Sequence, residues 1–311
     1  MKLAWIFPGQ GSQEVGMGKA VFDASPAAKA VFEASDRALG RSISKLCFDG
    51  PLEDLTLTYN TQPALVTTSS AILAAMREQV PNLPLPSFAA GHSLGEYSAL
   101  VASGALALED AVRLVELRGR AMQAAVPEGR GAMVALLGGD REAALKLCED
   151  AQSAGLVQPA NFNAPGQVVL SGEKAAVERA TELAGERKLK AIPLKVSAPF
   201  HCSLMEPAAR AVEAALRDVR VGELAFPVVA NANAEANQDK AHVAGLLVRQ
   251  IDGAVLWEQS VNLMANAGVT HALEIGSGKV LAGLVKRIDK RISVLSVSDP
   301  ESIAKIGAFL G

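Results

Sequence analysis

Short apolar runs alternate along the chain with alanine-rich stretches of helical period. The apolar runs are bounded by Gly, Pro or Asn, and they include LAWIF at 3–7, SFAA at 87–90, HALEIG at 271–276 and SVLSV at 293–297. Strands that alternate with helices are typical of an α/β protein with a mainly parallel sheet. The pattern therefore predicts an α/β fold.

The middle of the chain has a different order of elements. It predicts a strand at 132–137, a helix at 141–154, strands at 156–160 and 167–171, a helix at 173–187 and a strand at 189–196. This β-α-β-β-α-β order is that of a ferredoxin-like unit. We therefore expect a small subdomain at 128–196, inserted into a larger one formed by 1–127 and 197–311. A cleft between two such bodies is a common place for a ligand site.

Composition excludes several classes of function. The chain has 311 residues, a net charge of -3 and 50% hydrophobic residues, with no basic arm of the kind that nucleic-acid binding requires. No apolar run approaches the roughly 18 residues of a membrane span, and the run in MKLAWIF is too short for a signal peptide. We expect a cytoplasmic protein that binds neither nucleic acid nor membrane.

Cysteine and histidine usage predicts neither a disulfide framework nor a metal site. The three cysteines, Cys47, Cys148 and Cys202, lie far apart, and the four histidines are not clustered with them. We interpret the cysteines as small buried residues and expect no bound metal.

The segment AAGHSLGEYSAL places Ser93 between Gly91 and Gly95. It fits G-x-S-x-G, with an expected strand before it and an expected helix after it, which is the setting of a serine nucleophile on a tight turn. Small residues are needed there because the neighbouring backbones come close together. The pattern alone also fits a glycine-rich turn with an incidental hydroxyl.

A serine nucleophile needs a base, and the four histidines differ in their settings. His92 adjoins the serine, where side chains diverge, and His242 and His271 lie at an expected helix start and strand start. His201, in SAPFHCSLM, follows a strand end and is the candidate by elimination, although it could also simply fill a loop-helix junction. For the acid that orients the histidine, Asp140 and Asp252 are possible, and a neutral acceptor could serve instead.

The helix expected around EDAVRLVELRGRAMQAA carries an arginine on its apolar face. Arg118 falls on one arc with Ala111, Leu114, Val115 and Met122, whereas Arg113, Glu116 and Arg120 lie opposite. A buried guanidinium needs an anion, and its planar fork suits a carboxylate. The anion could be an internal Asp or Glu, or the carboxylate of a substrate.

The loop FPGQGSQ follows the first expected strand. It lacks the third glycine of a dinucleotide fingerprint and the lysine of a phosphate loop. Its backbone amides could face an oxyanion together with the amide of Leu94, the residue after the serine. A plain turn is the other interpretation.

Seven separated segments resemble the malonyl-CoA:acyl carrier protein transacylases, the acyltransferase family of fatty acid and polyketide synthesis. They run almost end to end, in the order FPGQGSQ, GHSLGEYSAL, ELRGRAMQ, VPEGRGAM, NFNAPGQVVLSG, APFHCSLM and EIGSGKVL. The resemblance implies an α/β-hydrolase-like large subdomain with an inserted ferredoxin-like small subdomain. It also implies transfer of a malonyl group from malonyl-CoA to the phosphopantetheine thiol of acyl carrier protein.

Position by position, the resemblance implies a role for each matching residue. Ser93 would carry the acyl group and His201 would be its base, oriented by a main-chain carbonyl that best matches Gln250. The amides of Gln10 and Leu94 would hold the oxyanion, and Arg118 would bind the carboxylate. Met122 and Phe200 would line the acyl pocket, and a phenylalanine before the histidine goes with malonyl over methylmalonyl in related polyketide acyltransferases.

The mechanism implied is ping-pong transfer through a malonyl-serine by a monomer, with no metal or other cofactor. A local cationic excess between 271 and 295 suggests a docking patch for the acidic carrier protein, although it could be a solvated helix face. The patch comprises Lys279, Lys286, Arg287, Lys290 and Arg291. A serine esterase or thioesterase, a non-catalytic acyl-binding relative and an acyltransferase of a polyketide or malonate-decarboxylase system remain as alternatives.

Overall fold

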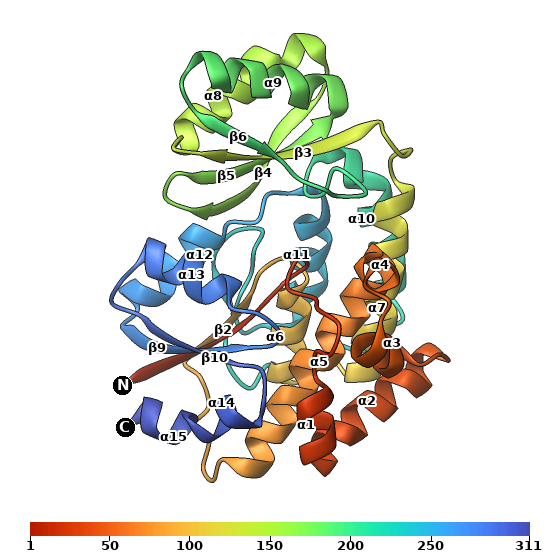
Figure 1. Ribbon diagram of the computed structural model, residues 1–311, viewed down its shortest axis with the longest axis vertical. Coiled ribbons are helices and arrows are strands. Elements are labelled where there is room, and N and C mark those ends of the chain that lie inside the picture. Colours follow the sequence, from red (N-terminus) through yellow and green to blue (C-terminus); the bar gives the residue numbers. More distant parts are fainter.

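The computed structural model describes all 311 residues, which form two bodies, each built on its own β-sheet (Figure 1). The larger body holds a six-stranded sheet of order β10-β9-β1-β2-β7-β8. Every neighbouring pair in it is parallel except β7 and β8, so the predicted α/β fold is confirmed. Its strands are β1 (Lys2–Phe7), β2 (Phe88–Gly91), β7 (Val228–Val229), β8 (Ala236–Asn237), β9 (Val269–Ile275) and β10 (Ser293–Val297).

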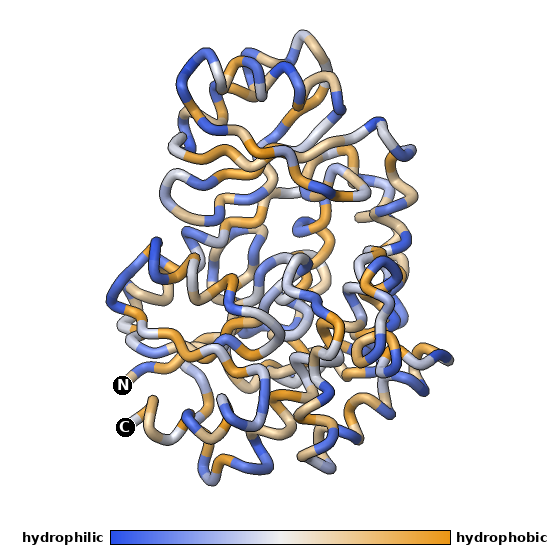
Figure 2. Tube along the Cα trace, in the orientation of Figure 1, coloured by the Kyte–Doolittle hydropathy of each residue, from blue (hydrophilic) through white to orange (hydrophobic).

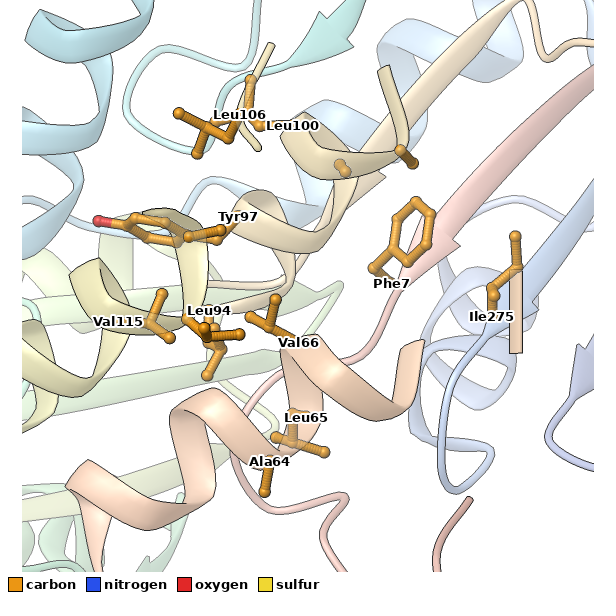
Figure 3. Packing of buried hydrophobic residues seen from close by; sticks show 14 of the residues in the cluster. Phe7, Ala64, Leu65, Val66, Leu94, Tyr97, Leu100, Leu106, Val115 and Ile275 are labelled. Carbon is orange, nitrogen blue, oxygen red and sulfur yellow. The ribbon is translucent and has the colours of Figure 1, made fainter. Parts of the chain in front are cut away.

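Thirteen of the helices belong to the larger body and pack around this sheet. Side chains from its strands and helices form two hydrophobic cores: alternate residues of β1 enter the larger core (Trp5) and a smaller core under α12 and α13 (Ile6). Figure 3 shows part of the larger core, where Leu94 and Tyr97 from the start of α6 lie near Val66 of α5 and Val115 of α7. The helices are α1 (Lys19–Ala24), α2 (Pro26–Leu39), α3 (Ile43–Asp49), α4 (Leu52–Thr56), α5 (Thr58–Gln79), α6 (Gly95–Ser103), α7 (Leu108–Ala124), α10 (Glu206–Leu216), α11 (Lys240–Asp252), α12 (Trp257–Asn266), α13 (Val280–Ile288), α14 (Pro300–Ala304) and α15 (Ile306–Leu310).

The smaller body is a four-stranded antiparallel sheet of order β4-β5-β3-β6, covered on one side by two helices (Figure 1). The elements follow one another as β3 (Gly131–Leu137), α8 (Arg141–Ala151), β4 (Val157–Ala164), β5 (Gln167–Glu173), α9 (Lys174–Glu186) and β6 (Lys190–Pro193). This is the predicted ferredoxin-like order. The last strand is shorter than predicted and ends at Pro193, although the N–H of Leu194 still donates to the carbonyl of Met133 over 3.0 Å.

Two main-chain hydrogen bonds join the bodies directly. The N–H of Phe162 in β4 donates to the carbonyl of Val255 over 2.9 Å, and the N–H of Val255 donates to the carbonyl of Ala160 over 2.8 Å. Val255 lies between α11 and α12 of the larger body. The small sheet is therefore tied to the large body through β4 as well as through its two chain connections.

Hydropathy follows this architecture. Figure 2 shows hydrophilic residues recurring along the outer helices and the connecting loops. None of the helices combines the length and the apolar character needed to cross a lipid bilayer.

Candidate active site

Ser93 lies on a tight turn between β2 and α6 with a φ of 50°, a left-handed conformation that non-glycine residues rarely adopt. The two flanking glycines are required by close backbone contact. A Cβ on Gly91 would lie 1.9 Å from the carbonyl carbon of Gly95, and a Cβ on Gly95 would lie 2.1 Å from the carbonyl oxygen of Phe7. The turn therefore presses against the end of β1 and presents the hydroxyl at the carboxyl edge of the parallel sheet.

His201 lies beside this serine, although 108 positions separate the two in sequence. Ser93 Oγ is 2.7 Å from His201 Nε2, and the carbonyl oxygen of Gln250 is 2.9 Å from His201 Nδ1. Burial and the nearby Arg118 lower the pKa of His201 to about 3. The imidazole is therefore neutral at physiological pH, and its Nε2 can accept the serine proton when Nδ1 donates to the carbonyl.

None of the other histidines or the candidate acids is hydrogen-bonded to the serine hydroxyl or to His201, although His92 also lines the cavity beside Ser93. His92 Nε2 is 2.7 Å from Asn163 Oδ1, and His242 is exposed at the start of α11. His271 contacts Thr270 at the start of β9. Asp140 caps the N-terminus of α8 by accepting the N–H of Ala143, and neither it nor Asp252 is hydrogen-bonded to His201.

Arg118 points inward from α7, as the sequence predicts, and is 1% exposed. It forms no ion pair; its hydrogen-bond acceptors are neutral. Nη1 donates to Gln62 Oε1 over 2.8 Å, whereas Nη2 donates to Gln250 Oε1 over 2.9 Å and to Ser93 Oγ over 3.2 Å. Its buried Nε has no partner. The guanidinium therefore keeps donor capacity and positive charge beside the serine hydroxyl.

Two main-chain amides next to the serine are unused by the protein. The loop after β1 lies against the serine turn, since a Cβ on Gly9 would be 2.3 Å from the carbonyl oxygen of His92. The N–H groups of Gln10 and Leu94 donate no hydrogen bond within the protein. Free amides beside a nucleophile are the donors that a developing oxyanion requires.

A cavity of about 130 Å³ opens at the Ser93 hydroxyl, between the two bodies. Met122 and Phe200 line it, as the sequence predicts, together with Gln10, Arg118 and His201. The remaining wall comes from α5, the smaller body and the segment after it, and no local pattern in the sequence indicates it. These residues are Gln62, Met133, Asn161, Leu194 and Val196.

The cations between 271 and 295 are all exposed, on α13, at the residue before it and in the loop after it. They are not equally available. Arg291 pairs with Asp289, and Arg287 Nη1 donates to Gln167 Oε1 of β5 over 2.7 Å. Lys279, Lys286 and Lys290 make no ion pair. No group of three or more His, Cys, Asp or Glu side chains is placed to hold a metal ion.

A serine on a strained turn, a neutral histidine at its hydroxyl and two free amides define an acyl-transfer site on an α/β scaffold. Comparison with known proteins identifies the family of acyl-transfer proteins to which the chain belongs. The family model described as acyl transferase domain matches residues 4–303. The chain belongs to this acyl transferase family.

Similar proteins carry more specific names. The chain is 49% identical to the malonyl CoA-acyl carrier protein transacylase of Bacillus subtilis, over 97% of this chain and 95% of that one. It matches the acyl-carrier-protein S-malonyltransferase structure from Bartonella henselae with a TM-score of 0.97 and 45% identity, over all of both chains. A malonyl-transacylase solved with a type II polyketide acyl-carrier protein matches with a TM-score of 0.94 and 44% identity, over 98% of each chain. The resemblance drawn from the seven segments is confirmed.

Proposed function

We propose that this protein transfers the malonyl group of malonyl-CoA to the phosphopantetheine thiol of an acyl carrier protein, through a malonyl ester on Ser93. One observation carries the choice of acyl group. Arg118 is a buried cation whose hydrogen-bond acceptors are all neutral, and its Nη2 is 3.2 Å from the serine hydroxyl. A carboxylate on the acyl chain would supply the anion that this guanidinium lacks.

The first half-reaction forms the acyl-enzyme. As Ser93 Oγ attacks the thioester carbonyl carbon, its proton moves to Nε2 of His201, which the Gln250 carbonyl holds through Nδ1–H. The tetrahedral intermediate places its oxyanion on the amides of Gln10 and Leu94. The carbon–sulfur bond then breaks, and the CoA sulfur leaves with the proton from Nε2.

The second half-reaction runs the same steps in reverse. The carrier thiol gives its proton to His201 Nε2 and its sulfur attacks the ester carbonyl of malonyl-Ser93. When the intermediate collapses, Oγ takes the proton back and the malonyl thioester leaves on the carrier. No step requires a metal or another cofactor.

The cavity suits a short acyl chain. Met122 and Phe200 limit its width, and the bulk of Phe200 supports malonyl over methylmalonyl because a branch on the α-carbon needs more room. Gln62 and Gln250 hold the guanidinium in one orientation, so the carboxylate would bind at a defined place. This contact would hold the malonyl ester on Ser93 in a fixed position and so disfavour its hydrolysis by water.

The proposal extends to the partner and the setting of the enzyme. The exposed cations Lys279, Lys286 and Lys290, with Arg287 and Arg291 at their edge, would help to dock the acidic carrier protein. The protein would act as a monomer in the cytoplasm.

Intact-mass measurement tests the proposal in two steps. Mixing the protein with malonyl-CoA should add the mass of one malonyl group, and Ser93→Ala should abolish the adduct. Adding holo acyl carrier protein should then move that mass to the carrier. A protein that gains no adduct, or that releases free malonate as fast without a carrier, would instead support a binding protein or a thioesterase.

A carrier of polyketide synthesis is a second candidate acceptor. The structural neighbour solved with such a carrier is as similar to this chain as others that are named only for acyl-carrier-protein malonylation. Comparing kcat/KM for fatty-acid and polyketide carrier proteins from the same cell would decide between them.

A further inference from the structure

Glu96 is a buried carboxylic acid directly beneath the serine turn. It lies in the first turn of α6, is 2% exposed and forms no ion pair. Its Oε2 accepts two hydrogen bonds, from the N–H of Asn231 over 3.0 Å and from Nε2 of Gln250 over 2.8 Å. A buried acid without a cationic partner is costly, so its position calls for an explanation.

The first of the two partners clamps the serine turn. Asn231, which is fully buried just after β7, accepts the N–H of Ser93 at its Oδ1 over 2.7 Å. Its Nδ2 donates to the carbonyl of Gly91 over 2.8 Å. One amide side chain therefore bridges both sides of the strained turn, and Glu96 holds the main chain of that residue.

The second partner supports the histidine and the arginine. The main-chain carbonyl of Gln250 faces His201 Nδ1, and the side-chain Oε1 of Gln250 accepts a hydrogen bond from Arg118. Its Nε2 donates to Glu96 and also to the carbonyl of Ser93 over 2.8 Å. Glu96 therefore determines the direction of the Gln250 side chain, which spans the serine, the arginine and α11.

We propose that Glu96 is a positioning residue for acyl transfer. One of its carboxyl oxygens, Oε2, holds both Asn231, which clamps the Ser93 turn, and Gln250, which orients His201. The proposal rests on the Ser93–His201 pair of the proposed function. Glu96 touches neither the substrate nor the reacting atoms, so it acts through Asn231 and Gln250. Three segments that are far apart in sequence meet at this oxygen: α6, the segment after β7 and α11.

Position 96 requires a side chain that accepts two hydrogen bonds. Burial raises the pKa of Glu96 to about 7, whereas the bonds from Asn231 and Gln250 and the charge of Arg118 oppose that rise. Asn231 and Gln250 both donate to the same oxygen, Oε2, so an uncharged acceptor at that place would keep the same geometry. The amide oxygen of a glutamine could accept the same two bonds, whereas leucine would leave both donors buried and unpaired.

The test measures the reactivity of Ser93 with a fluorophosphonate, whose fluoride the serine oxygen displaces without malonyl-CoA or a carrier. We expect E96L to lower the second-order rate constant about 100-fold, because small displacements of a catalytic pair cost that much. E96Q should restore the rate to within about tenfold of wild type.

E274L is the matched control: Glu274 is also fully buried and accepts hydrogen bonds from Leu281, Ala282 and Ser296, away from the site. It should lower the melting temperature as E96L does and leave the rate of the folded protein unchanged.

A folded E96L that reacts like wild type overturns the proposal, as does an E274L that loses as much reactivity. If E96L does not fold, E96D decides the question, because it withdraws the oxygen by one methylene and keeps the carboxylate. A normal rate for E96D overturns the proposal, whereas a loss that E96Q does not share supports it. Wild-type protein that reacts with the probe and not with malonyl-CoA would reject the proposed function alone.

Discussion

The two sheets of this protein contribute different things to one cavity. In the parallel sheet, the carboxyl ends of neighbouring strands lie at one edge, and the segments after β1, β2 and β7 bring Gln10, Ser93 and Asn231 together there. The antiparallel sheet has no such common edge. It offers side chains along its strands, Met133 of β3 and Asn161 of β4. The parallel body therefore carries the reacting groups, and the antiparallel body forms a wall of the acyl pocket.

The strongest test of this division is removal of Arg118 from the larger body. We expect R118A to lower kcat/KM for malonyl-CoA about 1000-fold, since the substrate carboxylate would lose its buried cation. The loss for acetyl-CoA should be far smaller, because acetyl has no carboxylate and R118A then removes only the bonds of Arg118 to Ser93, Gln62 and Gln250 and its effect on the pKa of His201. Steady-state kinetics with both donors measures the ratio.

R113A is the matched control for R118A, because Arg113 lies on the exposed face of the same helix. It should leave both donors unaffected. Equal losses for malonyl and acetyl groups in R118A would remove the carboxylate-binding role.

Acid stability should also depend on the larger body. The pKa of His201 is lowered to about 3, so the folded protein resists the proton that the unfolded chain accepts below the ordinary histidine pKa of 6.5. This contribution to stability is complete above pH 6.5 and is lost as the pH falls toward 3. Between pH 7.5 and 5, wild type should lose about 2 kcal/mol more unfolding free energy than H201N. Denaturant titrations at the two pH values measure this difference, and parallel losses would contradict the neutral imidazole.

Changes in the smaller body should alter selectivity more than rate. Met133 faces the cavity, and M133A should raise the preference for methylmalonyl-CoA relative to malonyl-CoA about tenfold, because it makes room for a branch. L136A is the control: Leu136 lies on the same strand but belongs to the separate hydrophobic core of the smaller body, with side chains of α8 and α9. If L136A changes selectivity as much as M133A, the wall does not act through shape.

The smallest effect should come from the surface patch on α13. K286E/K290E should raise KM for the carrier protein about tenfold at low salt, with kcat retained. Both lysines are exposed and make no ion pair. Arg287 is left unchanged because it is hydrogen-bonded to Gln167 of the smaller body, so its substitution would also break that contact. K29E/K45E, at exposed positions of other helices, is the control. An unchanged KM would exclude this patch as the docking surface.

Local pattern was enough to predict much of this protein. Alternating runs predicted the α/β fold and the βαββαβ order, because hydrophobic periodicity acts over a few residues. The spacing of Gly91, Ser93 and Gly95 predicted the tight turn, since only small residues allow that backbone approach. Helical periodicity placed Arg118 on the buried face of α7, and the structure confirms its burial.

The partners of these residues were decided only by the tertiary structure. From the residues alone, the sequence left open whether Arg118 meets an internal acid, and its acceptors proved to be Gln62, Gln250 and Ser93. Nothing local indicated Asn231 or Glu96 as supports of the serine turn. These hydrogen bonds join residues up to 157 positions apart, so they depend on how the strands order themselves and how α11 packs. Periodicity determines which face of an element is buried, but only the closed fold determines what that face meets.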